Sequence, residues 1–233
     1  MAFADHFSTI AARYAAYRPH YPPALVELLA MQAPARGLAW DAGCGTGQLS
    51  VALAARFERV IATDPSQAQI DAAEVAPRVT YRCEPAEQSS LEAGSCDLVV
   101  AAQAAHWFDW PRFVAEAGRV ARPGALVALV SYGVPDAPEL AAYREKIAPF
   151  WPRGREHVEN GYRDLVWPWP AVGAPPMELV EHWTGEELLG YVTTWSATVK
   201  MTAAQGTRAL EELALPPERR AIRWPLAIKL ARR

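Results

Sequence analysis

Short apolar runs alternate with amphipathic stretches from residue 38 onward, and each run is bounded by glycine, proline or aspartate. Runs of this length are typical of buried strands, whereas the intervening stretches place apolar residues at helical spacing. The predicted strands are Leu38–Trp40, Val60–Thr63, Val79–Arg82, Leu98–Ala101, Leu126–Ser131, Met177–Trp183 and Ala221–Leu230. The predicted helices are Pro23–Met31, Gln48–Phe57, Ser66–Glu74, Trp110–Ala121, Glu186–Trp195 and Ala203–Leu213. This alternation predicts a parallel sheet with crossover helices.

Two segments lie outside the alternation. Residues 1–37 carry several aromatic side chains ahead of the first helix and are expected to cover the mouth of a site. Residues 149–183 are rich in tryptophan and proline, which predicts an irregular, stiff and largely strandless cap over a substrate pocket. A chain of 233 residues is long enough for one such domain, 1–233, in which 38–148 form the core and 184–233 the last helices and strand.

A glycine-rich segment, Asp41-Ala42-Gly43-Cys44-Gly45-Thr46-Gly47, follows the first core strand and opens a helix, where α/β sheets bind ligands. Residue 48 is glutamine, so the spacing differs from the GxGxxG of dinucleotide sites. Asp41 would repel a pyrophosphate but could attract an ammonium group, directly or through water. Asp64 ends the second strand, where a carboxylate can accept hydrogen bonds from both hydroxyls of a ribose. These features favour S-adenosylmethionine over NAD or ATP.

The order of these residues resembles the class I S-adenosylmethionine-dependent methyltransferases: Asp41-x-Gly43-x-Gly45-x-Gly47, Asp64, then Asp97-Leu98-Val99-Val100. Four further stretches look like a small-molecule subgroup related to the trans-aconitate methyltransferases: YAAYRPHYP at 14–22, PAE at 85–87, QAAHWF at 103–108 and TWS at 194–196. The resemblance implies a Rossmann-like, doubly wound α/β fold with a mostly parallel sheet of seven strands, the last antiparallel. It also implies an enzyme that methylates a small molecule, such as a carboxylate or a hydroxyl compound.

The resemblance assigns roles to individual residues. Asp64 would hold the ribose, while Ala86 and Glu87 would lie beside the adenine. Related proteins often have aspartate where this chain has Pro85, so backbone groups around Ala86 are expected to replace that side chain. The cofactor site implied by the resemblance and by the glycine loop consists of Tyr14, Arg18, Asp41, Gly43, Gly45, Asp64, Ala86, Glu87 and Gln103.

Some of these residues could have a purely structural role instead of binding the cofactor. Tyr14 and Arg18, which the family suggests fold over the methionine end, could equally be a packing aromatic and a solvated cation. Glu87 could be a surface cap. Asp97, at the start of a strand, is expected to organise a loop rather than to touch the ligand.

Methyl transfer from a sulfonium needs in-line approach of the acceptor rather than an elaborate acid/base set. A carboxylate acceptor is already ionised and would be positioned by arginines, for which Arg153, Arg155 and Arg163 in the cap are candidates. A hydroxyl acceptor could need a base, and His106, just after the fourth strand, is the best-placed candidate. His106 could instead be a hydrogen-bonded wall of the pocket, which Trp107 would also line.

Composition argues against several classes of binding partner: nucleic acid, membranes and metal ions. With 23 Lys and Arg against 26 Asp and Glu, the chain has no cationic field for nucleic acid or a membrane surface. No apolar run approaches the roughly 18 residues of a membrane helix. The 3 cysteines form no CxxC pair and the 5 histidines show no metal-ligand spacing, so we expect a cytoplasmic protein without a metal.

Two other functions fit parts of the pattern. The same pocket in a non-catalytic protein would hold S-adenosylmethionine as a sensor or scaffold. A nicotinamide-dependent oxidoreductase is disfavoured by the absent GxGxxG spacing and by Asp41. The sequence leaves the oligomeric state open.

Overall fold

A central sheet organises residues 17–233, the part of the chain that the computed structural model describes. Within these residues the sheet has eight strands in the order β3-β2-β1-β4-β5-β8-β6, and β7 also pairs with β8. The strands are β1 (Leu38–Ala42), β2 (Arg59–Asp64), β3 (Val79–Cys83), β4 (Cys96–Ala102), β5 (Ala121–Tyr132), β6 (Ala171–Val172), β7 (Met177–Trp183) and β8 (Arg220–Arg232). Strands β1 to β5 are parallel, and β8 is antiparallel to its neighbours. The Rossmann-like α/β fold predicted from the sequence is confirmed.

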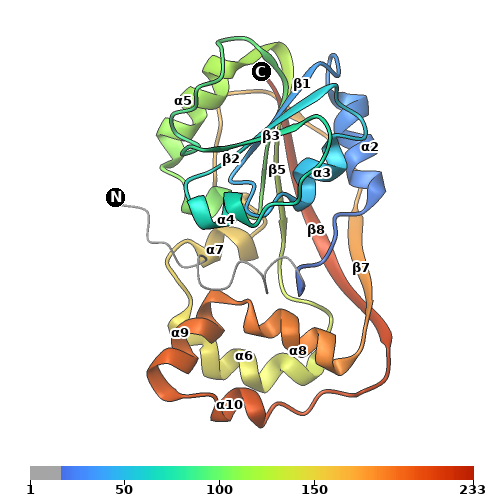
Figure 1. Cartoon of the computed structure of the whole chain (residues 1–233), viewed down its shortest axis with the longest axis vertical. Coiled ribbons are helices and arrows are strands. Elements are labelled where there is room, and N and C mark those ends of the chain that lie inside the picture. The colour runs from blue at the N-terminus through green and yellow to red at the C-terminus, as the bar shows by residue number, and fades with distance from the viewer. Residues whose placement is uncertain (1–16) are drawn as a thin grey trace.

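Helices cover both faces of the sheet (Figure 1). Helices α2 (Pro23–Gln32) and α3 (Gln48–Leu53) lie on one face, and α5 (Trp110–Val120) lies on the other. Figure 1 shows four helices gathered below the sheet: α6 (Ala141–Ile147), α8 (Gly185–Thr193), α9 (Ser196–Gln205) and α10 (Arg208–Glu211). The remaining helices are α4 (Gln67–Asp71), α7 (Arg155–Glu159) and the short 3-10 turns η1 (Ala105–Trp107), η2 (Pro138–Leu140) and η3 (Ala148–Phe150).

The central strands are buried on both faces, which explains why they read as unbroken apolar runs. Trp40 of β1 faces α5 and packs with Phe113, whereas its neighbour Ala39 faces α2 and packs with Leu25. A third cluster, which includes Tyr191 and Trp224, joins the lower helices to β7 and β8. The helices below the sheet are therefore fixed to it by apolar packing.

Several predicted boundaries differ from the structure. The sheet has eight described strands rather than seven, because Ala171–Val172 in the expected strandless cap pairs with β8. The predicted helix Ala203–Leu213 is interrupted at Gly206, whose φ of 81° ends α9 before α10 begins. The predicted helix Gln48–Phe57 already ends at Leu53.

Two further helices keep their predicted positions with shifted ends. The helix expected over Ser66–Glu74 is shortened to α4. The helix expected over Glu186–Trp195 starts one residue earlier, because the Thr184 side chain and Glu187 form a capping box around its first turn. Local capping therefore decides the start of α8. Among residues 17–233, no helix is long and apolar enough to cross a membrane.

Candidate cofactor and acceptor site

A cleft of about 940 Å³ lies at the carboxyl ends of β1, β2 and β4. This is the edge of the sheet at which doubly wound folds bind ligands. The cleft is lined by every sequence-predicted site residue that the structure describes: Arg18, Asp41, Gly43, Gly45, Asp64, Ala86, Glu87, Gln103, His106 and Trp107. Tyr14, also predicted, lies outside the described residues. The structure therefore brings the predicted residues together, and their individual roles stay predictions.

Backbone hydrogen bonds attach the glycine loop to β2. The N–H groups of Gly43 and Cys44 both donate to the carbonyl of Thr63, at 2.8 and 2.9 Å. The N–H of Gly45 donates to Oδ2 of Asp64 at 3.0 Å. The loop and the acidic residue at the end of β2 therefore form one rigid unit.

Gly43 and Gly45 share a backbone conformation that favours glycine, but the space around them differs. Gly43 and Gly45 both have positive φ, 73° and 56°. A Cβ on Gly43 would lie 2.5 Å from the Cβ of Ala104, so the loop packs too closely against the chain after β4 for a side chain. A Cβ on Gly45 would meet nothing nearer than Oε1 of Gln69 at 3.9 Å. The loop at Gly45 therefore leaves room for a ligand against its backbone.

Asp64 is oriented by two backbone donors. Its Oδ2 accepts from Gly45, and its Oδ1 accepts from the N–H of Ser66 at 2.9 Å. A carboxylate oxygen can accept more than one hydrogen bond. Two neighbouring acceptor oxygens suit a group that offers two neighbouring hydroxyls, such as a ribose.

Asp41 is a buried carboxyl with incomplete hydrogen bonding. Its side chain borders the cleft although the residue is only 1% exposed. The hydroxyl of Ser50 donates to Oδ2 at 2.6 Å, and Oδ1 has no hydrogen-bond partner. Burial, with a smaller contribution from the charge of Asp64, raises the pKa of Asp41 to about 7. An ammonium group nearby would satisfy this carboxyl and restore its charge, so the site fits an amino-acid moiety.

Glu87 and Gln103 both make structural hydrogen bonds at the cleft wall. Oε1 of Glu87 accepts from the N–H of Asp109, at the start of α5, at 2.7 Å. Gln103 has a φ of 54°, and its Nε2 donates to the carbonyl of Tyr132 at 2.7 Å. Glu87 thus lines the cleft and also makes the kind of capping contact that was the alternative reading of the sequence. Gln103 joins the ends of β4 and β5.

Asp97 lies at the opposite end of β4 from the cleft. Its Oδ2 accepts from the N–H groups of Gly37 and Leu38 at 2.8 and 3.0 Å, and its Oδ1 forms an ion pair with Arg122 at 2.9 Å. The expectation that this aspartate organises a loop is confirmed.

A smaller chamber of about 50 Å³ adjoins the cleft. The two share five lining residues: Arg18, Gln103, His106, Trp107 and Tyr132. The rest of the chamber wall comes from Gly133, which follows β5, and from the cap and the lower helices: Trp151, Pro152, Arg155, Tyr191, Trp195 and Ser196. Sequence reasoning assigned no site role to Tyr191 or Trp195, although Trp195 lies in the TWS stretch. The chamber is therefore an aromatic compartment with two arginines.

Arg155 is the cap arginine that faces this chamber. Its guanidinium lies 4.3 Å from the centre of the Trp151 ring, and its side chain is 18% exposed. Nε forms an ion pair with Oε1 of Glu159 at 3.5 Å but has no hydrogen-bond partner among the described residues. Burial lowers the pKa of Arg155. Arg153 borders the part of the cleft outside the chamber, which we call the outer cleft. Arg163 lines neither the cleft nor the chamber, and it donates to the carbonyl of Asn160.

Arg18 reaches the chamber from the N-terminal side. Its Nη2 donates to the carbonyl of Thr194 at 3.2 Å, and its guanidinium carbon lies 5.5 Å from the centre of the Tyr191 ring. These contacts place a second cation beside the chamber, in the segment that the sequence predicts to cover the site.

His106 is a neutral wall residue at neutral pH. Its Nδ1 shares a hydrogen bond with the hydroxyl of Tyr162 at 3.0 Å. Burial, together with the charges of Arg155, His157 and Arg18, lowers the pKa of His106 to about 3. A histidine with so low a pKa is a weak base.

His157 is a second histidine on the cleft, and sequence reasoning missed it. Its Nδ1 lies 2.5 Å from Oδ2 of Asp164, and the residue borders the outer cleft but not the chamber. A carboxylate that holds one ring nitrogen orients the other, as in histidines that act as bases. The two residues are 7 apart in a segment without regular periodicity, so no local motif indicated the pair.

Comparisons with known proteins decide the family. Residues 40–129 match the model of a methyltransferase domain. A Dictyostelium discoideum protein named as a methyltransferase is 33% identical over 221 residues, covering 91% of this chain and 84% of its own. A solved structure described as a type II methyltransferase from Anaeromyxobacter dehalogenans is 46% identical, with a TM-score of 0.84, and the match covers 93% of this chain and 98% of that chain. The chain belongs to the class I S-adenosylmethionine-dependent methyltransferases.

S-adenosylmethionine is accordingly the methyl donor of this methyltransferase. A geranyl diphosphate methyltransferase solved with S-adenosylmethionine has the same fold, with a TM-score of 0.51 at 16% identity over 100% of this chain and 92% of that chain. At that identity the likeness concerns the fold alone. Within the described residues, no group of three or more His, Cys, Asp and Glu side chains is arranged to hold a metal ion.

Proposed function

We propose that this methyltransferase acts on a small molecule that bears a carboxylate, and that a carboxylate oxygen accepts the methyl group. The observation that carries the proposal is the chamber beside the cleft, which presents Arg155 and Arg18 next to a neutral His106. When bound, S-adenosylmethionine supplies an electrophilic methyl group: a carboxylate lone pair forms the C–O bond, and the C–S electron pair stays on sulfur. No proton moves in this step.

The cofactor end of the site is formed by the chain's own polar groups. Asp64, already oriented by two backbone N–H groups, accepts from the ribose hydroxyls. Asp41 would pair with the ammonium group, and the backbone at Gly43 and Gly45 would hold the methionine portion. The wall at Ala86 and Glu87 then receives the adenine, as the family resemblance implies. This orientation directs the methionine end toward His106 and the chamber, which both border the cleft.

The arginines favour an anionic acceptor. Arg155 is largely enclosed by the Trp151 ring, so its attraction for an anion is less screened than at an exposed site. By the family resemblance Arg18 pairs with the carboxylate of the cofactor, which leaves Arg155 for the acceptor. The planar donor fork of arginine suits a carboxylate in either role. The aromatic side chains around the chamber exclude water from the reacting atoms.

The state of His106 also favours a carboxylate. A hydroxyl acceptor must lose a proton, and a histidine with a pKa of about 3 takes one up poorly at neutral pH. A carboxylate has already lost its proton. His106, held by Tyr162, then serves as a neutral hydrogen-bonding wall rather than as the general base.

A hydroxyl acceptor is the second candidate, because His157 is paired with Asp164 on the outer cleft. In that case His157 would be the base, and the acceptor would lie outside the chamber. The two candidates differ in product: alkali releases methanol from a methyl ester but not from a methyl ether.

The test is transfer of tritiated methyl from S-adenosylmethionine to matched pairs of carboxylates and alcohols with the same carbon skeletons. We expect label in the carboxylates, released as volatile methanol by alkali. R155Q should lower kcat/KM for the carboxylate about 10- to 100-fold while the cofactor Kd stays unchanged, because a charged hydrogen bond is lost. R153Q, on the outer cleft, is the matched control. Alkali-stable label in the alcohols, abolished by H157Q, would refute the carboxylate acceptor.

A further inference from the structure

The loop 84–91, the first part of the connection between β3 and β4, forms one wall of the cleft. Pro85, Ala86 and Glu87 all line the cleft, and Ala86 is buried. The loop contains neither helix nor strand, so side-chain hydrogen bonds must determine much of its conformation. The source of those hydrogen bonds decides how firmly this wall is held.

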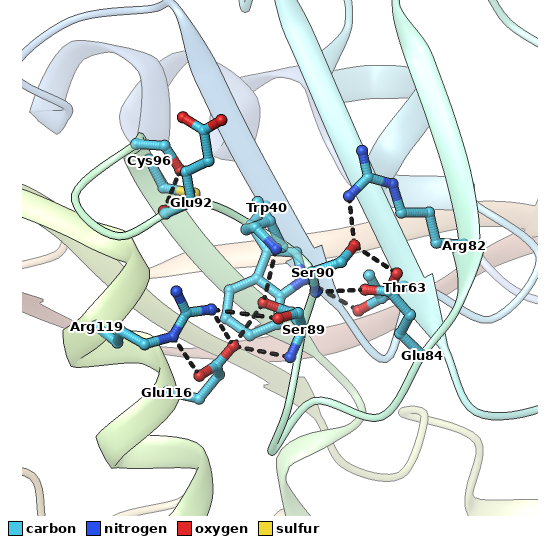
Figure 2. Close-up of polar contacts among 12 residues, drawn as sticks. Trp40, Thr63, Arg82, Glu84, Ser89, Ser90, Glu92, Cys96, Glu116 and Arg119 are labelled. Atoms are coloured by element: carbon cyan, nitrogen blue, oxygen red, sulfur yellow. Dashed lines mark hydrogen bonds and ion pairs between the residues drawn. The ribbon is translucent and has the colours of Figure 1, made fainter.

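Glu116 of α5 binds the loop from the side of the core. Its Oε1 accepts from both the N–H and the hydroxyl of Ser89, at 2.8 and 2.6 Å, and its side chain is only 9% exposed. Arg119 donates to Glu116 through Nε at 2.8 Å and Nη2 at 2.6 Å, and its Nη2 also donates to the carbonyl of Ser89 at 3.2 Å. Figure 2 shows the three side chains in this closed arrangement.

The charge of Glu116 is maintained by this arrangement. Burial alone would raise its pKa, but the hydrogen bonds from Arg119 and Ser89 outweigh burial and lower the pKa of Glu116 to about 2. Glu116 is thus ionised at neutral pH, and its hydrogen bonds to Ser89 are charge-assisted. The ion pair with Arg119 lies within α5 and needs no loop, so the two bonds to Ser89 are an additional connection.

A second set of contacts ties the same loop at its exposed side. The N–H and the hydroxyl of Ser90 donate to the Glu84 carboxylate at 2.9 and 2.6 Å, and Arg82 donates to the Ser90 hydroxyl at 2.7 Å (Figure 2). The contacts of Ser90 are exposed and contribute little, whereas the Glu116 carboxylate is nearly buried, and hydrogen bonds to a buried charged group are the stronger kind. The Glu116 contact should therefore dominate.

We propose that Glu116 is a positioning residue for the cofactor: through Ser89 it fixes the loop 84–91 against α5, so that Ala86 and Glu87 keep the shape of the adenine side of the cleft. The proposal rests on the proposed function for the placement of adenine at this wall. Glu87 adds a second link from the loop to α5 through the N–H of Asp109. Helix α5, which packs on one face of the sheet, thereby determines the geometry of a wall of the cleft.

The test compares E116Q with E84Q, which removes a carboxylate from the exposed side of the same loop. Calorimetric titrations use two probes, S-adenosylhomocysteine and adenosine, and the second lacks the amino-acid portion. We expect E116Q to weaken both probes by the same factor, about tenfold. E84Q should stay within about twofold of the wild type. Amide protons of 84–91, Ser89 first, should exchange faster in E116Q than in the wild type.

A merely structural role would give a different result. It would lower the Tm of E116Q but leave both affinities unchanged well below the Tm, and this outcome overturns the proposal. Weakening of S-adenosylhomocysteine alone, with adenosine unaffected, also overturns it. If E116Q does not fold, S89A, which loses only the hydroxyl donor, should weaken both probes by a smaller common factor. Failure of the wild type to bind either probe would instead reject the cofactor placement in the proposed function.

Discussion

Replacing Asp41 by asparagine should remove a pH-dependent destabilisation of the cofactor-free protein. Asp41 is buried, and its pKa is raised from its ordinary value of 3.8 to about 7. The pKa of Asp41 is higher in the folded protein than in the unfolded chain. The contribution of Asp41 to stability is therefore fully present below pH 3.8 and is lost as the pH rises through 7. Asparagine keeps an oxygen that can accept from Ser50 but cannot ionise.

The magnitude follows from the two pKa values. Between them, the unfolding free energy falls by about 1.4 kcal/mol per pH unit, because the unfolded chain has already released the proton. From pH 5 to pH 8 the wild type should lose about 2.5 kcal/mol through this residue. D41N loses none of it. The advantage of D41N over the wild type should therefore grow by about 2.5 kcal/mol over this range.

Urea unfolding at pH 5 and pH 8 without cofactor measures this difference, and comparison across pH cancels any constant cost of the amide. S50A is the matched control. It keeps the carboxyl and removes the hydrogen bond that lowers its pKa, so its pH dependence should be at least as steep as that of the wild type. Parallel pH profiles for D41N and the wild type would show that Asp41 ionises normally in the fold, and the reasoning from burial would be wrong.

Three further predictions concern single residues. The unfolding free energy of the wild type should fall as the pH drops from 6.5 to 3, because the folded-state pKa of His106 is about 3 and only the unfolded chain binds this proton. H106Q should make that fall shallower by up to about 1.4 kcal/mol per pH unit. Urea titrations at pH 6.5 and 4.5 test this prediction. G47A should lose about 1–3 kcal/mol of stability by thermal unfolding, because Gly47 has a φ of 90° and a Cβ would lie 2.1 Å from the Tyr81 hydroxyl. T184A should lose about 1 kcal/mol by the same assay, with unchanged cofactor Kd, because the capping box of α8 is lost; no change in Tm would contradict this.

The strands of the core could be predicted because burial on both faces leaves a continuous apolar run. Leu98 and Val99 point to opposite faces, yet both are fully buried, so the run Leu98–Ala101 within β4 carries no polar residue. Helix ends were predicted less well. Gly206 lies inside a run of helix-forming residues, and only its positive φ in the fold shows that the helix stops there. The two-residue strand β6 owes its existence to β8 alone.

The cofactor half of the site could be predicted because it is local. Asp41, Gly43 and Gly45 lie within one strand-to-helix turn, and Asp64 ends the next strand, so neighbouring parallel strands bring all four together. The pKa of His106 could not be predicted in this way. It depends first on burial and then on the charges of Arg155 and His157, which follow His106 by about 50 residues and approach it only through the path of the cap.

The acceptor chamber lies largely beyond what the family match can describe. The matched residues 40–129 include the glycine loop, Asp64 and His106, but Arg18, Trp151, Arg155 and Tyr191 fall outside this range. Membership in the family therefore determines the methyl donor and leaves the acceptor undetermined. The acceptor must be inferred from the charge and burial of the chamber itself, where an arginine stacked on a tryptophan faces a histidine that stays neutral. In the proposed function that combination would bind an anion without any proton transfer, so a carboxylate acceptor depends on Arg155 rather than on the architecture that the chain shares with other methyltransferases.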